Sequence, residues 1–257
     1  MFKNLWVGAS GMSAQTHKMD SIANNIANIN TNGYKKSVAS FADLLYQEKN
    51  KTDLPVSYAQ LVPSYGAGVR VSSVTGVFLQ GNLYTTGRDL DLAIEGKGFF
   101  AVQLPGGGTG YTRDGSFNVD GEGRLVNKFG LYLKDDIEVP ENTEKIRVTA
   151  DGKVTAVDTQ GNEEDLGDIV LYKVQNLAGL KAIGNNLYQT TDASGEAEEH
   201  TPGRDVGVVK QGFLEGSNVD LAEEMVSMIT AQRAYEINSR VVKNADQMWE
   251  IANNIRR

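Results

Sequence analysis

The chain has 257 residues, a formal net charge of -8 and a sequence pI of about 4.9. This acidic balance argues against a nucleic-acid-binding protein, which usually presents a basic surface. The chain contains no cysteine, which excludes disulfides, thiol chemistry and zinc sites built from cysteine.

The N-terminal segment predicts a helix with an apolar row that repeats every seven residues. Its opening, Met1–Asp20, lacks the apolar stretch of a secretory signal, so a protein that left the cytoplasm with this segment would not be expected to use the ordinary signal-peptide route. No run of apolar residues is long enough to predict a transmembrane helix. The apolar row consists of Leu5, Met12, Met19 and Ile26, with Ile22 beside it.

An asparagine-rich stretch, NNIANINTNGYKK (Asn24–Lys36), closes this segment. Asparagine side chains compete for backbone hydrogen bonds, so Asn30–Gly33 predicts the end of the helix, with Gly33 in the left-handed conformation. Lys35 and Lys36 would then follow the last helical carbonyl groups, where positive charge is favourable. Three asparagines inside the predicted helix are expected to hydrogen-bond between helices: Asn24, Asn25 and Asn28.

The middle of the chain predicts β structure. All five prolines lie between Pro55 and Pro202, together with most of the 28 glycines. Lys145–Asp158 contains two short strand patterns around the turn signal Asp151-Gly152. Turn signals this frequent predict a compact all-β domain.

Candidate catalytic and metal-binding groups are few. His17 and His200 lie in no metal-ligand or catalytic-triad pattern, and Asp89 and Asp91 at strand spacing are best explained as a solvated strand face. PGGGTG (105–110) lacks the Lys-Ser/Thr of a phosphate-binding loop and predicts a hairpin loop. We therefore predict no enzyme, no cofactor, no metal site and no small-molecule substrate.

The C-terminal segment predicts a second, longer helix. Ser217–Arg257 contains no glycine or proline and would span about 60 Å as a helix. Ser217 and Asp220 resemble a capping box at its start. Its apolar row recurs every seven residues, at Leu221, Met228, Tyr235, Val242 and Trp249, and is widened by Met225, Ile229 and Met248.

A helix of this length with a single apolar stripe needs a partner helix along its whole length. The sequence therefore predicts a mixed α and β fold in which long N- and C-terminal helices form an α-helical coiled-coil core domain. This domain would comprise residues 1–45 with 210–257, followed by an extended linker at 46–94 and a central all-β domain at 95–205. The simpler alternative is a long helix packed within one compact domain.

Four motifs in order resemble those of the flagellar rod and hook family of bacterial axial proteins. The first is Ser10–Gln47, whose IANNIAN is similar to the family's Ala-Asn-Asn-Leu-Ala-Asn helix end. The second, DLAIEGKGFFAVQ (Asp91–Gln103), is similar to the family's Asp-Leu-Ala-Ile-x-Gly-x-Gly-Phe-Phe segment. The others are Tyr111–Phe117 and Gly216–Val242. The resemblance covers essentially the whole chain.

The resemblance implies a structural subunit of the flagellar basal-body rod, with the distal rod form favoured and a proximal rod form of similar size as the alternative. It also implies a helical homopolymer that meets proximal rod proteins, hook-side axial proteins and the periplasmic and outer-membrane ring proteins. Export would use the flagellar export apparatus. The apolar rows and asparagines would form the assembly interface: Leu5, Met12, Met19, Ile22, Asn24, Asn25, Ile26, Asn28, Leu221, Met225, Met228, Ile229, Tyr235, Val242, Met248 and Trp249.

A function of another class is a secreted β-domain that binds carbohydrate. Tyr111, Phe117 and Tyr132 would supply its aromatic platform. This hypothesis gives no role to the two helical segments.

Overall fold

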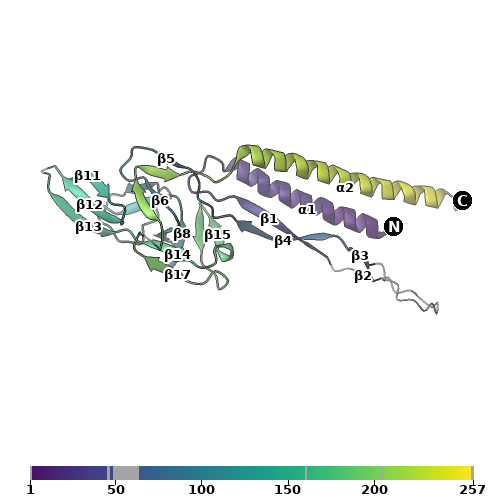
Figure 1. Ribbon diagram of the computed structural model, residues 1–257, viewed down its shortest axis with the longest axis horizontal. Coiled ribbons are helices and arrows are strands. Elements are labelled where there is room, and N and C mark those ends of the chain that lie inside the picture. Colours follow the sequence, from purple (N-terminus) through teal and green to yellow (C-terminus); the bar gives the residue numbers. More distant parts are fainter. Residues whose placement is uncertain (1, 45–46, 49–63, 160, 204, 256–257) are drawn as a thin grey trace. The chain divides into compact units, whose positions relative to one another are not determined.

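The structure is a computed structural model that describes residues 2–44, 47–48, 64–159, 161–203 and 205–255 (Figure 1). The described residues form two compact units. Unit 1 comprises residues 1–27, 37–75 and 220–257, and unit 2 comprises residues 28–36 and 76–219. Much of the predicted linker, at 49–63, lies outside the described residues.

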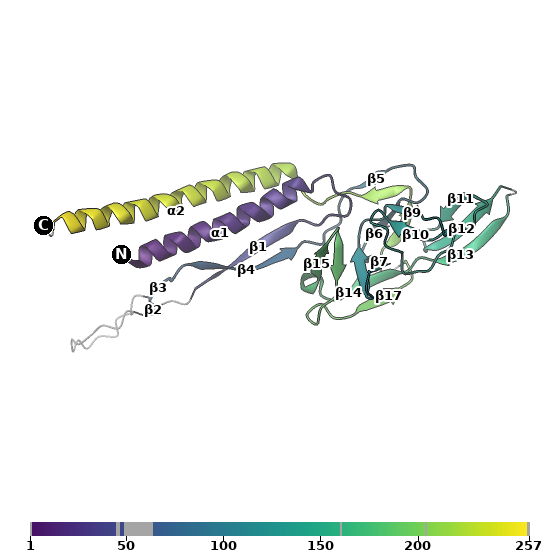
Figure 2. The ribbon, with the colours of Figure 1, turned by 180° about the vertical axis from the view of Figure 1, so that it is seen from behind.

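The two helices of unit 1 run side by side in opposite directions (Figures 1 and 2), with α1 at Phe2–Ala27 and α2 at Leu221–Ile255. Small residues line their contact. A Cβ added at Gly8 would lie 2.8 Å from Val242 Cγ2, so the helices approach too closely there for any larger side chain. Gly11 is equally confined, and the buried alanines of the pair are Ala14, Ala231 and Ala245.

Within its described residues, unit 1 also contains four strands. β1 (Ser37–Asp43) pairs with β4 (Val69–Gly76), and β2 (Gln47–Glu48) pairs antiparallel with β3 (Ser64–Tyr65). β1 packs along α1. The turn before β4 also touches α1, because a Cβ at Gly68 would lie 2.4 Å from the Ser10 hydroxyl oxygen.

Unit 2 consists of short, mostly antiparallel strands. One sheet has four strands in the order β15-β16-β8-β7, another has three in the order β11-β12-β13, and four further pairs are β9-β10, β14-β17, β6-β18 and β5-β19. The strands are β5 (Leu83–Thr85), β6 (Leu92–Glu95), β7 (Phe100–Gln103), β8 (Thr109–Thr112), β9 (Phe117–Val119), β10 (Leu125–Asn127), β11 (Thr143–Val148), β12 (Lys153–Asp158), β13 (Glu163–Asp168), β14 (Leu171–Val174), β15 (Lys181–Gly184), β16 (Leu187–Gln189), β17 (Ala197–His200), β18 (Val208–Gln211) and β19 (Phe213–Glu215). A single 3-10 turn, η1 (Leu177–Gly179), precedes β15.

The turn chemistry predicted two hairpins correctly. Asp151-Gly152 joins β11 to β12, with Gly152 at φ 87°, in the left-handed region that favours glycine. The loop between β7 and β8 runs over residues 104–108, so it covers most of PGGGTG (105–110), whose last two residues begin β8. Both hairpins confirm the interpretation of these glycine-containing segments as turns.

The core of unit 2 is apolar and fully enclosed. Phe99, Phe100 and Phe117 are among its largest buried side chains, and the Phe100 and Phe117 rings meet edge to face at 5.4 Å. Smaller aliphatic residues from several strands surround the Phe100–Phe117 pair. Phe99 belongs to a second buried cluster, with Tyr111, Tyr172 and Tyr188, so the short strands enclose two apolar clusters.

The predicted coiled-coil core domain is wrong. The described chain has two α-helices, one from each end, and a central β-rich region with many strands, but no long coiled-coil core. A coiled coil buries its heptad row, whereas Leu221, Tyr235 and Trp249 are each more than a third exposed. The helices meet through glycine and alanine instead.

The helix boundaries also differ from prediction. α1 ends at Ala27, before Asn30–Gly33, although Gly33 does take a left-handed conformation at φ 68°. α2 begins at Leu221, and the cap is Asp220, whose Oδ1 accepts hydrogen bonds from two backbone N–H groups of the first turn at 2.8 and 3.1 Å. The predicted Ser217 cap is therefore wrong. Neither helix, over its described residues, meets the length and apolarity required to span a membrane.

Candidate functional site

The structure divides the predicted interface residues by burial. Ile22 and Asn25 are buried within the chain. Half-buried are Leu5, Met12, Met19, Ile26, Asn28, Met228 and Val242. Exposed are Asn24, Leu221, Met225, Ile229, Tyr235, Met248 and Trp249. A large share of the α2 residues chosen by their spacing therefore faces away from α1.

Most of an apolar surface on α2 lies outside the residues predicted from the seven-residue spacing. Val226, Ile237, Val241, Met248 and Ile251 are between 42 and 62% exposed. Their spacing of 11, 15, 22 and 25 residues from the first corresponds to nearly whole helical turns, so they share one side of α2. We call these five residues the outer face of α2. Contiguous exposed apolar surface is typical of interaction sites.

A buried polar cluster joins three elements of unit 1. The Asn25 side-chain amide donates to the Glu224 carboxylate at 3.2 Å and to the Ser37 carbonyl at 2.9 Å, and its oxygen accepts from the Ser37 backbone N–H at 2.9 Å. The Ser21 hydroxyl donates to the same Ser37 carbonyl. Asn25 thus links α1 to α2 and to β1, which explains an asparagine inside a helix.

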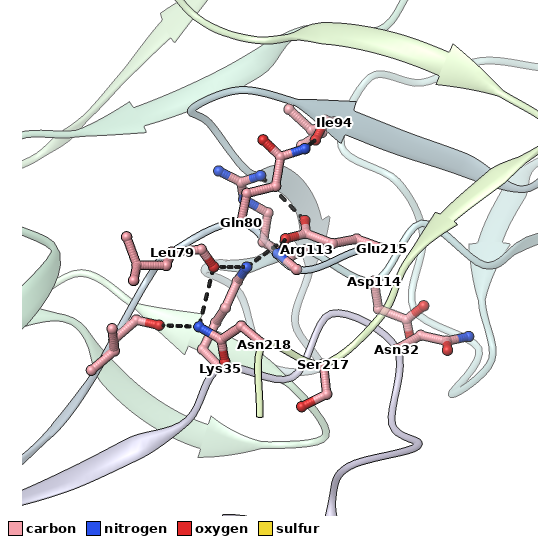
Figure 3. A network of polar contacts seen from close by, with 12 residues as sticks. Asn32, Lys35, Leu79, Gln80, Ile94, Arg113, Asp114, Glu215, Ser217 and Asn218 are labelled. Carbon is pink, nitrogen blue, oxygen red and sulfur yellow. Dashed lines mark hydrogen bonds and ion pairs between the residues drawn. The ribbon is translucent and has the colours of Figure 1, made fainter. Parts of the chain in front are cut away.

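A second buried cluster lies in unit 2 and is ionic (Figure 3). Lys35 Nζ lies 2.5 Å from Glu215 Oε1, and Arg113 Nη1 lies 3.3 Å from Glu215 Oε2. The side chains of Lys35 and Glu215 are completely buried, and that of Arg113 is 5% exposed. Burial lowers the pKa values of both cations, while the Glu215 charge acts in the opposite direction.

Hydrogen bonds to the backbone complete this ionic cluster. Lys35 also donates to the Leu79 carbonyl at 2.7 Å, and Glu215 Oε1 accepts from the Gly81 N–H at 2.8 Å. The Glu215 carbonyl accepts from the Gly33 N–H at 2.7 Å. The expectation that Lys35 serves the end of a helix is wrong, because its ammonium group is buried against Glu215.

A partly buried acidic group of unit 2, Asp135, lies outside the ionic cluster. Burial raises the pKa of Asp135 to about 7, although a hydrogen bond from the Val170 N–H at 3.3 Å favours its charged form. The Glu199 charge raises that pKa further, and Lys134 lowers it. Near neutral pH this carboxyl group therefore changes its charge inside the fold.

The residues considered for catalysis do not assemble into a site. His17 is exposed on α1. Asp91 is 2% exposed and lies 3.5 Å from the Arg88 guanidinium, so the expected solvated strand face is wrong for this residue. In the described ranges, no group of three or more histidine, aspartate or glutamate side chains could hold a metal ion.

The carbohydrate platform is not formed. Phe117 is completely buried and Tyr111 is 7% exposed, so neither ring can stack on a sugar. Tyr132 stacks instead on the Arg124 guanidinium, 3.9 Å from the ring centroid. These aromatic side chains serve the core and a cation–π contact.

Two hollows accompany these features. In unit 2, a cavity of about 510 Å³ is lined by apolar residues that include Leu90 and Ile146 and by acidic residues that include Asp89, Asp120 and Glu141. In unit 1, a groove of about 390 Å³ runs between α1 and β4. Neither hollow contains a nucleophile paired with a base.

Sequence reasoning missed the charged members of both clusters because their partners are distant in sequence. Lys35 and Glu215 are 180 positions apart, and Asn25 and Glu224 are 199 apart. Rules based on residue spacing relate only residues that lie within a few helical turns of one another in the sequence. The sequence offered one weaker signal for a buried polar cluster, the asparagines inside α1. Asparagine is unfavourable inside a helix because its side chain competes for backbone hydrogen bonds.

Comparison with known families gives three matches in chain order. Residues 5–35 match the family described as flagella basal body rod protein. Residues 93–156 match the flagellar hook protein FlgE/F/G D1 domain, and residues 210–255 match the flagellar basal body rod FlgEFG protein C-terminal family.

Curated relatives match over their full length. The chain is 44% identical to the flagellar basal-body rod protein FlgG of Buchnera aphidicola subsp. Acyrthosiphon pisum, over 97% of this chain and 98% of that protein. It is 43% identical to FlgG of Borreliella burgdorferi and 36% identical to FlgG of Bacillus subtilis, each over 100% of both chains. Identity at this level over whole chains shows that the chain belongs to the family of the flagellar basal-body rod protein FlgG.

Proposed function

We propose that the chain is the structural subunit of the distal rod in the bacterial flagellar basal body. Membership of the FlgG family supports the rod assignment, and the exposed apolar side chains of α2 support self-assembly. Subunits would polymerise helically through their terminal helices into a shaft that transmits torque from motor to hook. A contact that repeats without closing on itself produces such a filament.

The outer face of α2 is the observation on which this proposal rests. Its five apolar residues are 42 to 62% exposed, whereas the close approach of α1 to α2 is at Gly8, Gly11 and buried alanines. Burying each such side chain is worth about 1.5–3 kcal/mol, so a neighbouring subunit that covers them would gain substantial binding free energy. The exposed predicted residues, such as Leu221 and Met225, would add to this interface.

The proposal includes further partners. The relatives are rod proteins of the basal body, so we expect the ends of the polymer to meet proximal rod proteins and hook-side axial proteins. Periplasmic and outer-membrane ring proteins would surround it. The subunit would pass through the flagellar export apparatus without a cleaved signal peptide and act in the periplasmic rod, without catalysis.

A pair of matched substitutions tests the role of the outer face. Ile237→Glu places a charge on that face, whereas Gln232→Glu adds the same charge to an exposed position on another side of α2. In a strain lacking its own copy, we expect Ile237→Glu to abolish hooks and filaments and Gln232→Glu to restore them. Electron microscopy of isolated basal bodies provides the measurement.

The monomer must stay folded for this test to be informative. We expect the circular dichroism of the Ile237→Glu monomer to match that of the unsubstituted chain, because the side chain is 58% exposed. Normal rods with Ile237→Glu would contradict the proposed interface.

A further inference from the structure

The turn that follows α1 contains a chemically reactive sequence. Asn32-Gly33 is the single asparagine–glycine pair among the 257 residues. Asparagine followed by glycine is the dipeptide most prone to deamidation, because glycine has no side chain to hinder attack by its own backbone nitrogen. This reactivity belongs to the flexible chain, so the folded environment decides whether it is expressed.

The reaction needs two atoms to meet. The Gly33 backbone nitrogen attacks the side-chain carbonyl carbon of Asn32, a carbon–nitrogen bond closes a five-membered succinimide, and the side-chain nitrogen leaves as ammonia with the proton from the Gly33 N–H. Water then opens the ring at either carbonyl. The products are aspartate, or isoaspartate, in which the main chain runs through the former side chain.

The fold engages both reacting groups. The Gly33 N–H donates to the Glu215 carbonyl at 2.7 Å, so its nitrogen and proton are committed to a buried hydrogen bond. The Asn32 side-chain oxygen accepts from the Tyr84 hydroxyl at 2.6 Å, so the carboxamide must give up this bond before it can rotate toward the Gly33 nitrogen. The Asn32 carbonyl accepts from the Asn186 amide at 2.7 Å.

The product would not fit this position. A Cβ added at Gly33 would lie 2.6 Å from the Asp114 backbone nitrogen, so the main chain has no room to shift. Isoaspartate adds a backbone atom immediately before Gly33 and would break the bond to Glu215. The same turn also carries Lys35 into the ionic cluster, so the damage would spread to a buried charge.

We propose that Asn32 is the principal deamidation site of this chain while it is unfolded, and that folding of unit 2 closes the site. The chain is then chemically vulnerable before it folds and protected afterwards. A chain that has aged at Asn32 loses the turn geometry that unit 2 requires. This inference is independent of the rod assignment.

The test compares folded and urea-denatured full-length chain during incubation at about pH 8. Trypsin cleavage after Lys18 and Lys35 releases a peptide that contains Asn32, and mass spectrometry locates the modified residue and separates aspartate from isoaspartate. In urea, we expect Asn32 to react faster than any other asparagine. In the folded chain, we expect its rate to fall about tenfold or more, because reaction then requires local opening.

A tyrosine substitution tests the structural cause. Tyr84→Phe removes the hydroxyl that holds Asn32, and Tyr235→Phe removes a hydroxyl of similar exposure on α2. We expect Tyr84→Phe to raise the folded-state rate about two- to tenfold, the equivalent of one hydrogen bond, and Tyr235→Phe to leave it unchanged. In urea, all three chains should react alike.

Three results would overturn the inference. Faster reaction at another asparagine in urea would remove the site assignment. Equal rates in folded and denatured chain would remove the protection. An unchanged folded-state rate in Tyr84→Phe would remove the role assigned to the Tyr84 hydrogen bond.

Discussion

Unit 2 buries most of its large apolar side chains, whereas unit 1 leaves many of its own in contact with solvent. Phe99, Phe100 and Phe117 are at most 2% exposed in unit 2, while Trp6 and Ile251 in unit 1 are 66% and 60% exposed. A unit whose apolar surface is already removed from water gains little by association. We therefore expect the β-rich unit to be stable by itself and the helical unit to associate with other subunits.

The first prediction concerns the stability of unit 2, where we expect the largest effect of a single substitution. Glu215→Gln keeps the shape of the side chain but leaves Lys35 and Arg113 as buried cations without an anion. Breaking a buried ionic cluster in this way costs about 3–5 kcal/mol. The urea midpoint of unit 2, followed by tyrosine circular dichroism, should fall sharply.

The control for this prediction is an exposed ion pair. Glu163 and Arg147 are 3.0 Å apart, but both side chains are 58% exposed. Solvent screens such pairs, so Glu163→Gln should leave the midpoint nearly unchanged. Equal losses from both substitutions would show that burial of the ionic cluster does not control stability.

The second prediction concerns a substitution that should destabilise the helix pair of unit 1 and leave unit 2 unchanged. Gly8→Val inserts a side chain where a Cβ already lies 2.8 Å from Val242, and overpacking of this kind costs about 1–3 kcal/mol. Both tryptophans, Trp6 and Trp249, lie in unit 1, so their fluorescence follows the helix pair. We expect the fluorescence transition to shift while the tyrosine signal of unit 2 is retained.

Ala9→Val provides the matched control, because it places the same β-branched residue in α1 at an exposed position. It should cost only the helix-propensity difference, a few tenths of a kcal/mol. A loss as large as that from Gly8→Val would argue that propensity, and not the close approach to α2, causes the effect.

The third prediction concerns pH and is confined to unit 2. Because the pKa of Asp135 is raised to about 7 in the fold, from an ordinary value of 3.8, its neutral form is favoured by folding. The stability that this group contributes is full below about pH 3.8 and is lost as the pH rises to about 7. Asp135→Asn should therefore stabilise unit 2 at pH 8 by about 1–3 kcal/mol, with little effect at pH 4.

Asp165 supplies the contrasting case for this titration. Its pKa is lowered, first by a hydrogen bond from Lys153. Asp165→Asn should therefore give no stabilisation at pH 8. Thermal melts across the pH range test both residues, and a flat difference between the unsubstituted chain and Asp135→Asn would refute the role of Asp135.

The smallest expected effect on the monomer concerns the outer face of α2. Val226→Ser alters a side chain that is 62% exposed, so the free energy of unfolding should change by no more than about 0.5 kcal/mol. The same substitution should weaken polymerisation, measured by sedimentation of the purified chain. A large destabilisation of the monomer would mean that this face already has a partner within the chain.

Local patterns predicted the elements of this fold well. The seven-residue rows correctly placed a helix near each end, and the Asp-Gly signals gave hairpins such as β11–β12. Both signals depend on residues close in sequence. The boundaries were less accurate, because Asp220 caps α2 where Ser217 was expected to do so.

The candidate sites were harder to predict because they depend on long-range contacts. The heptad interpretation gave weight to large residues such as Tyr235, yet the helices meet through Gly8 and Gly11, whose value lies in having no side chain. Nothing near Lys35 in sequence indicates that its partner is Glu215. The apolar rows therefore indicated that a surface exists, but not which part of it the chain covers by itself.

The Asn25 cluster gives the helix pair two mechanically different ends. Hydrogen bonds from Asn25 to Glu224 and Ser37 depend on angle, so a rotation or a one-residue slip of α2 would break them. At Gly8 the close contact is with the Val242 side chain, and van der Waals packing depends less on angle than a hydrogen bond does. A rotation or slip of α2 along α1 is thus opposed most strongly at the end of the pair where Asn25 lies.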